Sequence, residues 1–308
     1  MVDIGTAESN IDAIALVQRT TDPDTSGVRW LLYVKADGLY LKSEAGVVIG
    51  PLTSTVSVPS APSDLLSILT AAEIAVSGAT AATIGRMHVC SGTTADYTIT
   101  LPAAAGNAGK LIGFRMASAL TKLVTLDGNA AEKIDNVLTR IMWAGESAIL
   151  LCDGANWYKI AGKTIPMLCV MSLSANQSAF VTATVTKVNI DTVDIDNTGL
   201  MADIANKRII CKRPGNYQLG AKMQISSLSA VSNRTISWAY KNGAGLNDVQ
   251  CEGVGNVGTL WAQEAAGTVV LAVVDYIELN GMHMAGSNQV IRGGSGNSRL
   301  RVQEIPAW

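Results

Sequence analysis

The sequence predicts an all-β protein built from successive small domains: an N-terminal β-meander, a middle β-domain and a C-terminal jelly-roll sandwich. Apolar runs with period-two alternation, separated by turn-forming residues, recur from Trp30 to the C-terminal end. Helical spacing is confined to short stretches near residues 1–20 and 64–85. The 308 residues exceed a typical single domain about twofold. No fixed-period repeat is apparent, so solenoids and propellers are not expected.

Residues 1–52 are expected to form an N-terminal arm and a β-meander. The spacing of Ile11, Ile14, Leu16 and Val17 fits neither a short helix nor an extended arm closely, so both remain open. The β-rich runs lie at residues 30–34, 39–42 and 47–49, and Ala36-Asp37-Gly38 and Glu44-Ala45-Gly46 supply the turns between them.

Residues 53–85 are predicted to be a linker followed by a short helix. The stretch from Pro51 to Pro62 is rich in Ser, Thr and Pro, which favours an extended path. After it, apolar residues from Leu65 to Ile74 have helical spacing, and Ser63 or Asp64 could cap a helix that Gly78 would weaken.

The remaining residues are predicted to form two β-rich domains, 86–163 and 164–308. Strands of the first are expected at residues 97–101, 111–116, 123–126, 148–152 and 157–160. Strands of the second are expected at 167–173, 185–195, 208–211, 217–225, 235–240, 268–279 and 300–305. Because no helical pattern separates these closely spaced strands, a sandwich or jelly roll is favoured.

The composition points to self-association and excludes several classes of partner. Charged residues make up 16% of the chain, against roughly 25% in typical soluble proteins. So little charge is typical of a subunit that buries surface against identical copies. A net charge of −2 with no cluster of Lys and Arg argues against nucleic acid, and the strongest apolar run, Val269 to Val274, is too short to span a bilayer.

The expected cellular context is a cytoplasm. The first ten residues lack both a basic segment and a long apolar region, so no secretory signal is expected. Five scattered cysteines with no CxxC pair are expected to be buried free thiols, with no disulfide and no bound metal. They are Cys90, Cys152, Cys169, Cys211 and Cys251.

Several segments resemble modules of bacteriophage fibre and appendage proteins. WLLYVKADGLYLKSEAGVVIGP, from Trp30, is similar to β-modules near the N-termini of such proteins. YTITLPAAAGNAGKLIGFRM and GESAILLCDGANWYKI resemble a fibre module in which an LP…GK strand pair precedes a G…W hairpin. The matching positions are Leu101, Pro102, Gly109, Lys110, Gly145, Asp153, Gly154, Asn156 and Trp157.

The C-terminal segment resembles the phage branch of the complement-C1q and tumour-necrosis-factor jelly-roll superfamily. The resemblance lies in KRPGNYQLGAKM, with Gly215 and Tyr217, in DYIELNG, with Tyr276 and Leu279, and in the terminal SRLRVQEI. It implies a homotrimer, attached to a virion through its N-terminal region, with the globular trimer outermost. The chain has no long shaft, which makes a stubby tail appendage and a capsid-surface fibre comparably plausible.

Two motifs suggest ligands, and each also has a purely structural interpretation. Residues 253–258 match GxGxxG, but a strand follows where a nucleotide fold needs a helix, so a mobile jelly-roll loop is expected. Asp194 and Asp196, near Asp191, could supply oxygens to Ca²⁺. They also fit the solvated face of a half-buried strand whose other face carries Val193 and Ile195.

Catalysis is not expected, and neither is a cofactor. His88 and His283 lie in different domains and no nucleophile-elbow motif is present, so nucleophilic catalysis has no evident base. A paired-carboxylate capsule depolymerase remains an alternative, because any chain with 25 acidic residues offers pairs.

Aromatic and glycine-rich segments supply the candidate receptor-binding residues. Trp238 and Tyr240 share one strand face and are expected in the core or a subunit interface. Trp261, beside the glycine-rich 253–258 segment, could stack on a sugar or anchor a protein contact. Arg292 and Asn297 bound a candidate surface finger, with a plain flexible turn as the alternative.

The sequence therefore favours a non-enzymatic phage virion protein, a short fibre or tail appendage that displays a trimeric jelly roll for attachment to the host surface. Its expected partners are its own copies, other virion proteins through the N-terminal region, and a host-surface glycan or protein. A capsid decoration protein or head fibre is the alternative structural role.

Overall fold

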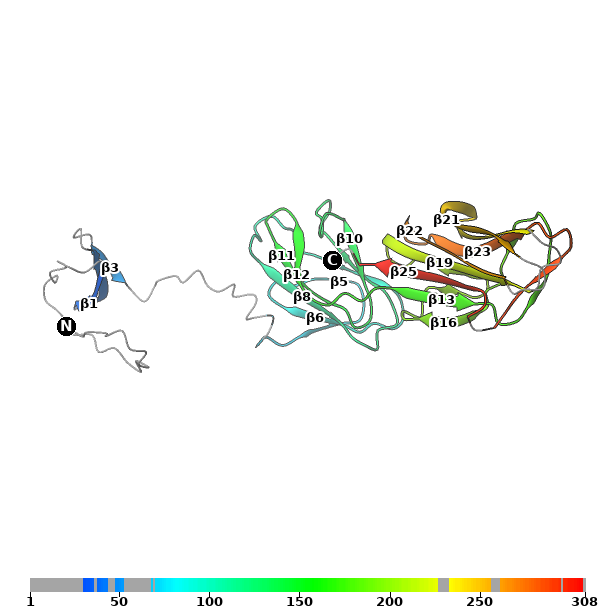
Figure 1. The fold of residues 1–308 in the computed structure, drawn as a ribbon. Coiled ribbons are helices and arrows are strands. Elements are labelled where there is room, and N and C mark those ends of the chain that lie inside the picture. The colour runs from blue at the N-terminus through cyan, green and yellow to red at the C-terminus, as the bar shows by residue number, and fades with distance from the viewer. Residues whose placement is uncertain are drawn as a thin grey trace, which may run out of the picture. The chain divides into compact units, whose positions relative to one another are not determined.

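The fold is described from a computed structural model (Figure 1). It describes residues 30–35, 38–43, 48–52, 68, 70–226, 233–255, 261–294 and 296–306. Contacts divide the chain into two units, residues 1–62 and 63–308, and each is described by itself. The predictions for residues 1–20, for the two turns of the meander and for the linker at 53–62 lie outside the described residues.

The first unit contains the predicted β-meander. Strands β1 (Trp30–Lys35), β2 (Gly38–Ser43) and β3 (Val48–Leu52) form one sheet in the order β1-β2-β3. Both pairings are antiparallel, and Tyr33 lies opposite Tyr40. The alternating β-rich pattern of this segment is therefore confirmed as strand.

The second unit begins with a module of two facing sheets, in the orders β10-β9-β7-β5 and β12-β11-β8-β6-β4. Its strands are β4 (Ile74–Val76), β5 (Thr80–Ala81), β6 (Met87–Cys90), β7 (Tyr97–Thr100), β8 (Leu111–Met116), β9 (Val124–Asp127), β10 (Thr139–Met142), β11 (Ser147–Cys152) and β12 (Trp157–Ala161). The predicted strands of this region are confirmed, and four short ones are added to them.

The chain winds through this module in a way that the sequence did not predict. From β4 to β9 it alternates between the two sheets, so β4, β6 and β8 pair in parallel, as do β5, β7 and β9. The strands thus pair in parallel over successive turns of the chain without forming a fixed-period repeat. The step from His88 to its partner Phe114 is nearly twice that from Ile74 to His88, so no fixed period exists to detect.

The helix predicted within residues 64–85 is described only in part, because residues 64–67 and 69 lie outside the described residues. Ile68 and Thr70 are helical, but β4 and β5 follow and belong to the two sheets of the middle module. Ile74, the last residue of the helical spacing, instead begins β4, whose Val76 pairs with Cys90 and is buried.

The C-terminal module is a sandwich of two antiparallel sheets. One runs β16-β13-β25-β19-β22, with β24 and β14 attached beside β19, and the other runs β17-β18-β23-β20-β21, with β15 on β23. Early and late strands are interleaved in both sheets, as in a jelly roll. The strands of the first are β13 (Leu168–Ser172), β14 (Gln177–Phe180), β16 (Thr192–Asp196), β19 (Gly215–Ile225), β22 (Trp261–Leu271), β24 (Gln289–Ile291) and β25 (Arg299–Ile305). Those of the second are β15 (Thr186–Lys187), β17 (Ala202–Asp203), β18 (Arg208–Ile210), β20 (Asn233–Lys241), β21 (Ala244–Gly255) and β23 (Tyr276–His283).

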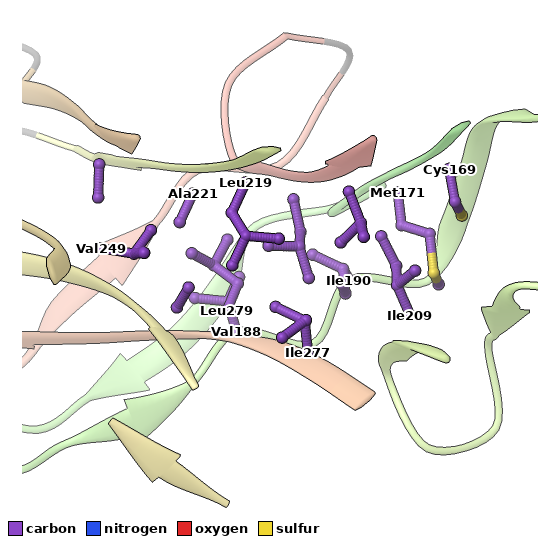
Figure 2. Close-up of a cluster of buried hydrophobic side chains, with 14 of the residues drawn as sticks. Cys169, Met171, Val188, Ile190, Ile209, Leu219, Ala221, Val249, Ile277 and Leu279 are labelled. Carbon is purple, nitrogen blue, oxygen red and sulfur yellow. The ribbon is translucent and has the colours of Figure 1, made fainter. Parts of the chain in front are cut away.

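The core of this sandwich follows from alternation along the long strands. Leu219 and Ala221 of β19 face Ile277 and Leu279 of β23 between the two sheets (Figure 2). Residues 268–279, predicted as one strand, are two, because the chain reverses between Leu271 and Tyr276, where Val274 has a φ of 68°. Residues 185–195 are likewise divided between β15 and β16.

Candidate interaction surfaces

The seven-stranded sheet presents a broad surface that we call the outer face, formed by side chains of β22, β19, β25, β13 and β16 that point away from the sandwich interior. One transverse row crosses all five strands, because consecutive members are register partners. It consists of Ile195, Val170, Arg301, Gly220 and Ala266. Small and apolar residues therefore dominate the middle of the face.

The two ends of the outer face differ in chemistry. At one end Asn216 lies between Ile305 and Val270, whose side chains are 41% and 67% exposed. At the other end Lys222 lies between Arg299 and Glu264. Aliphatic side chains exposed on a sheet face, with charges at its rim, are typical of a protein interface.

Strand β16 at the edge of this sheet differs from its prediction. Val193 and Ile195 were expected to be buried, but they are 37% and 46% exposed. Among the described residues the strand has a neighbour on only one side, β13, and more than a third of each apolar side chain stays exposed. An edge strand with exposed β-branched residues is an open site for association.

The calcium candidates are occupied by the protein's own hydrogen bonds. Asp196 accepts bonds from the backbone N–H groups of Gly199, Met201 and Ala202 at 2.8–2.9 Å, which closes the turn after β16. Asp194 accepts a bond from the Ser172 hydroxyl at 2.8 Å. In the part of the chain that the structure describes, no three acidic, His or Cys side chains are grouped as a metal would require.

The candidate receptor residues Trp261, Arg292 and Asn297 lie at one end of the sandwich. Ile225 at the end of β19 pairs with Trp261 on one side and with Ile291, next to Arg292, on the other. The structure thus brings these two segments to the same end of the sheet.

The described residues of the candidate finger, 292–294 and 296–297, are held by hydrogen bonds to their neighbours. The backbone N–H of Gly294 donates to the Leu173 carbonyl, that of Arg292 to Gln224, and the Asn297 side-chain amide to Gly293. A Cβ on Gly293 would lie 2.2 Å from the backbone of Ala175. The segment is packed closely against its neighbours because glycine permits this approach.

The structure describes the first three residues of the GxGxxG match. Gly253, Val254 and Gly255 continue strand β21 and pair with β20, so a mobile loop beginning at Gly253 was wrong. Residues 256–260 lie outside the described residues. The motif opens no helix among the residues that are described, and a phosphate site of the nucleotide-binding kind requires one.

A buried ionic network joins the middle module to the jelly roll. Arg213, between β18 and β19, contacts Glu146 of the middle module at 2.9 Å and Glu304 of β25 at 2.5 Å. All three side chains are less than 10% exposed. Burial alone would lower the pKa of Arg213, but the hydrogen bonds and charges of Glu304 and Glu146 outweigh burial and raise it. Burial raises the pKa of Glu146, against the opposing charge of Arg213.

The carboxylate oxygens of this network are engaged. Besides Arg213, Glu146 accepts backbone N–H bonds from Ile165 and Trp143, and Glu304 accepts one from Met167. Arg213 and Glu304 of the network line a cavity of about 570 Å³, together with Arg140, Thr139 and aliphatic residues that include Leu138, Ile141 and Ile305. A general acid needs a carboxyl that can exchange a proton with a substrate, and both carboxylates here are held by internal donors.

The two histidines are packed, neutral residues. His283 Nε2 donates to the Phe180 carbonyl at 2.7 Å, while its Nδ1 accepts from the Ala285 N–H. His88 accepts the Thr83 N–H at Nε2, and its Nδ1 lies 3.2 Å from the Gly113 carbonyl. Burial lowers the pKa of both.

The aromatic pair Trp238 and Tyr240 shares one strand face, as predicted, but that face is not the core. Both side chains are half-buried on the outer side of the six-stranded sheet, since Thr235, Ser237 and Ala239 occupy the inner positions. Their ring centroids are 6.3 Å apart in an edge-to-face arrangement.

Comparison with known proteins gives similarity of fold to solved structures only. No family description matches the chain, and no curated protein matches it. The C-terminal half is similar to murine APRIL, with 10% identity and a TM-score of 0.35, over 46% of this chain and 100% of that one. Eiger TNF from S. frugiperda matches with 8% identity and a TM-score of 0.36, over 46% of this chain and 94% of that one.

The globular domain of the zebrafish complement 1qA protein also matches, with 10% identity and a TM-score of 0.33, over 46% of this chain and 98% of that one. The jelly-roll assignment itself rests on the strand order described above.

The Arg213 network was missed from sequence, although a signal for it was present. Leu300, Val302 and Glu304 alternate on one face of the terminal strand, which places a carboxylate at a core position. A buried carboxylate requires a cation or several donors. No sequence feature indicated that Glu146 of another module would share the same cation.

Proposed function

We propose that this chain is a bacteriophage virion protein, a short fibre or tail appendage that displays a trimeric jelly roll for attachment to the host surface. The observation that carries the proposal is the outer face of the seven-stranded sheet, with Val270 and Ile305 exposed at one end and small residues across its middle. Its phage context rests on the resemblance of the fibre-like segments. Three copies packed through this face would cover the aliphatic residues that one copy leaves in water.

The proposed protein is a binder and not an enzyme. The carboxylates at the junction cavity are tied up by Arg213 and by backbone donors, which supports a structural role for them. Three weak sites on one trimer can bind a repetitive surface firmly through avidity, without a deep pocket. The expected location is the virion, after synthesis in the host cytoplasm, with attachment to other virion proteins through the N-terminal region.

The direct test is competition for adsorption. Purified full-length protein, first shown by light scattering to be trimeric, should slow the adsorption of intact phage to host cells. A trimer that neither binds cells nor alters adsorption would contradict host attachment and would favour a role in capsid decoration. Electron microscopy of virions labelled at the C-terminus separates these roles, because label at the tail tip and label on the shell are exclusive results.

A further inference from the structure

The outer side of the six-stranded sheet carries a line of side chains that we call the aromatic row: Gln250, Trp238, Asn280 and Lys187. Trp238 pairs in register with Gln250 on β21 and with Asn280 on β23, and Asn280 pairs with Lys187 on β15. Side chains of directly opposed residues share a sheet face. An indole therefore lies between two primary amides, with Tyr240 next to it along β20.

The rings of this surface are held in fixed positions. The indole Nε1–H of Trp238 donates to the Gln250 side-chain carbonyl, and the Tyr240 ring meets the indole at an interplanar angle of 74°. The Tyr240 ring also lies 3.4 Å from where a Cβ on Gly245 would be. Because these contacts fix the rings before a ligand arrives, little side-chain entropy would be lost on binding.

Asn280 supplies the observation that points to a ligand. Its side chain is only 6% exposed, and its Nδ2 group has no hydrogen-bond partner. A buried amide donor without a partner is costly, so a site that retains one is incomplete by itself. The Gln250 amide also retains its NH₂ group, because its carbonyl oxygen is the atom that receives the indole proton.

The charges around the aromatic row are already neutralised. Lys187 contacts Glu278 at 2.5 Å, Arg208 contacts Asp203 at 2.7 Å and Lys241 contacts Asp275 at 2.9 Å. No described cation beside the row is available for a phosphate or an acidic sugar without breaking one of these pairs. The surface thus offers ring faces and amide donors, and no net charge.

We propose that the aromatic row is a binding site for a neutral pyranose unit of a glycan. The apolar C–H face of such a ring packs on the indole, and its hydroxyl groups accept from the Gln250 amide. The Asn280 Nδ2 group is buried beneath the row, so it donates to the sugar only after the side chains that cover it shift on binding. This inference rests on the proposed function only for the source of the sugar, which would be the host surface. A single shallow site of this kind has a Kd of about 1 mM, and three sites on one particle raise the effective affinity.

The test is saturation-transfer NMR on the full-length protein with a mixture of the methyl glycosides of glucose, galactose, mannose and N-acetylglucosamine. Transfer to at least one glycoside is expected, and it should be lost in Trp238→Leu and reduced in Tyr240→Ala. Tyr158→Ala, which removes a half-buried tyrosine from the middle module, is the matched control and should leave transfer unchanged. The unfolding midpoint of each variant is measured alongside, so that Tyr240→Ala decides the test if Trp238→Leu does not fold.

No transfer to any glycoside at about 10 mM, tenfold above the expected Kd, overturns the inference, as does transfer that persists in both aromatic variants. This result is separable from the proposed function. Wild-type protein that blocks phage adsorption while binding no glycoside refutes the sugar site alone. Protein that binds a glycoside at Trp238 but does not affect adsorption refutes host attachment alone.

Discussion

Arg213 holds Glu304 through two parallel hydrogen bonds, from Nε to one carboxylate oxygen at 2.8 Å and from Nη2 to the other at 2.5 Å. The same guanidinium uses Nη1 for both oxygens of Glu146, at 2.9 and 3.0 Å. One cation thus serves two buried carboxylates from different modules. The Ile165 and Ile141 carbonyls accept the remaining bonds and complete the enclosure of the guanidinium.

Replacing Arg213 should be among the most destabilising substitutions in the chain. Arg213→Met leaves two buried carboxylates without their cation, which is expected to lower the free energy of unfolding by about 3–5 kcal/mol. Denaturant unfolding followed by far-UV circular dichroism measures the loss. Arg234→Met is the matched control, since Arg234 pairs with Glu252 in solvent and little change is expected. Equal effects of the two substitutions would contradict the role assigned to the network.

Stability should fall as the pH drops below neutral, and His283 should account for part of the fall. Its pKa is lowered in the folded protein by burial, so below about 6.5 the unfolded chain takes up a proton that the native state does not. This loss of stability is absent above that pH. As the pH falls it grows, at up to about 1.4 kcal/mol per pH unit, until the pH reaches the pKa of His283 in the folded protein.

The histidine effect is isolated by comparing variants. Glu146 acts in the opposite direction, because its raised pKa makes the native state take up a proton first as the pH falls through the range above 4.5. His283→Asn removes only the pH dependence of stability that comes from this histidine. Unfolding free energies between pH 5 and 7.5 should therefore decline less steeply in this variant than in the wild type, and parallel curves would show that His283 does not titrate in this range.

The sequence predicts those features of this fold that follow from alternation within a single strand, and not those that depend on which strands pair. Tyr217, Leu219, Ala221 and Met223 alternate with polar residues, and both the strand and its buried face follow from that alternation. The parallel winding of the middle module could not be predicted, because unequal steps leave no period and parallel pairing joins residues far apart in the chain.

The sites show the same division between local and long-range information. That Trp238 and Tyr240 share a face follows from their spacing, but whether the face is inner or outer depends on which sheet covers it. Val193 and Ile195 were assigned to the buried face of a half-buried strand because they alternate with Asp194 and Asp196, whereas β16 is an edge strand with both of them exposed. An aliphatic face that is buried by another copy of the chain has the same local pattern as one buried in the core.

Association through the outer face predicts a substitution that dissociates the protein. The full chain should scatter light as about three masses of 32.2 kDa. Val270→Glu places a carboxylate at the exposed end of the outer face and should shift the mass toward one chain, because burying an unpaired charge is costly. Val254→Glu, on the six-stranded sheet, is the control and should leave the mass unchanged. A wild-type monomer at micromolar concentration contradicts the trimer.

The cysteines should react according to their burial. Cys90, Cys152, Cys169 and Cys211 are buried and Cys251 is half-buried, and all five are free thiols in the structure. Burial raises the pKa of Cys90 to about 11, so only a small fraction of this side chain is thiolate at neutral pH. Alkylation of the folded protein should label Cys251 first, and unfolding without reductant should give five labels by intact mass. Fewer labels after unfolding would reveal a disulfide.

A fragment beginning near Thr164 should fold as a jelly roll and trimerise, but with lower stability than one beginning at Ser63. The shorter fragment keeps every strand of both C-terminal sheets and the whole outer face. It loses Glu146, and with it one partner of Arg213, and it loses Leu123 and Trp143, which are buried against the jelly-roll core. Burying side chains of this size contributes about 1.5–3 kcal/mol each, so a difference of several kcal/mol is expected in denaturant unfolding followed at equal trimer concentration.

Arg213→Met is the control for this comparison. It should destabilise the longer fragment much more than the shorter one, because only in the longer fragment does it leave two carboxylates without a cation. Equal stability of the two fragments would mean that the modules fold independently and that the junction adds nothing to the jelly roll.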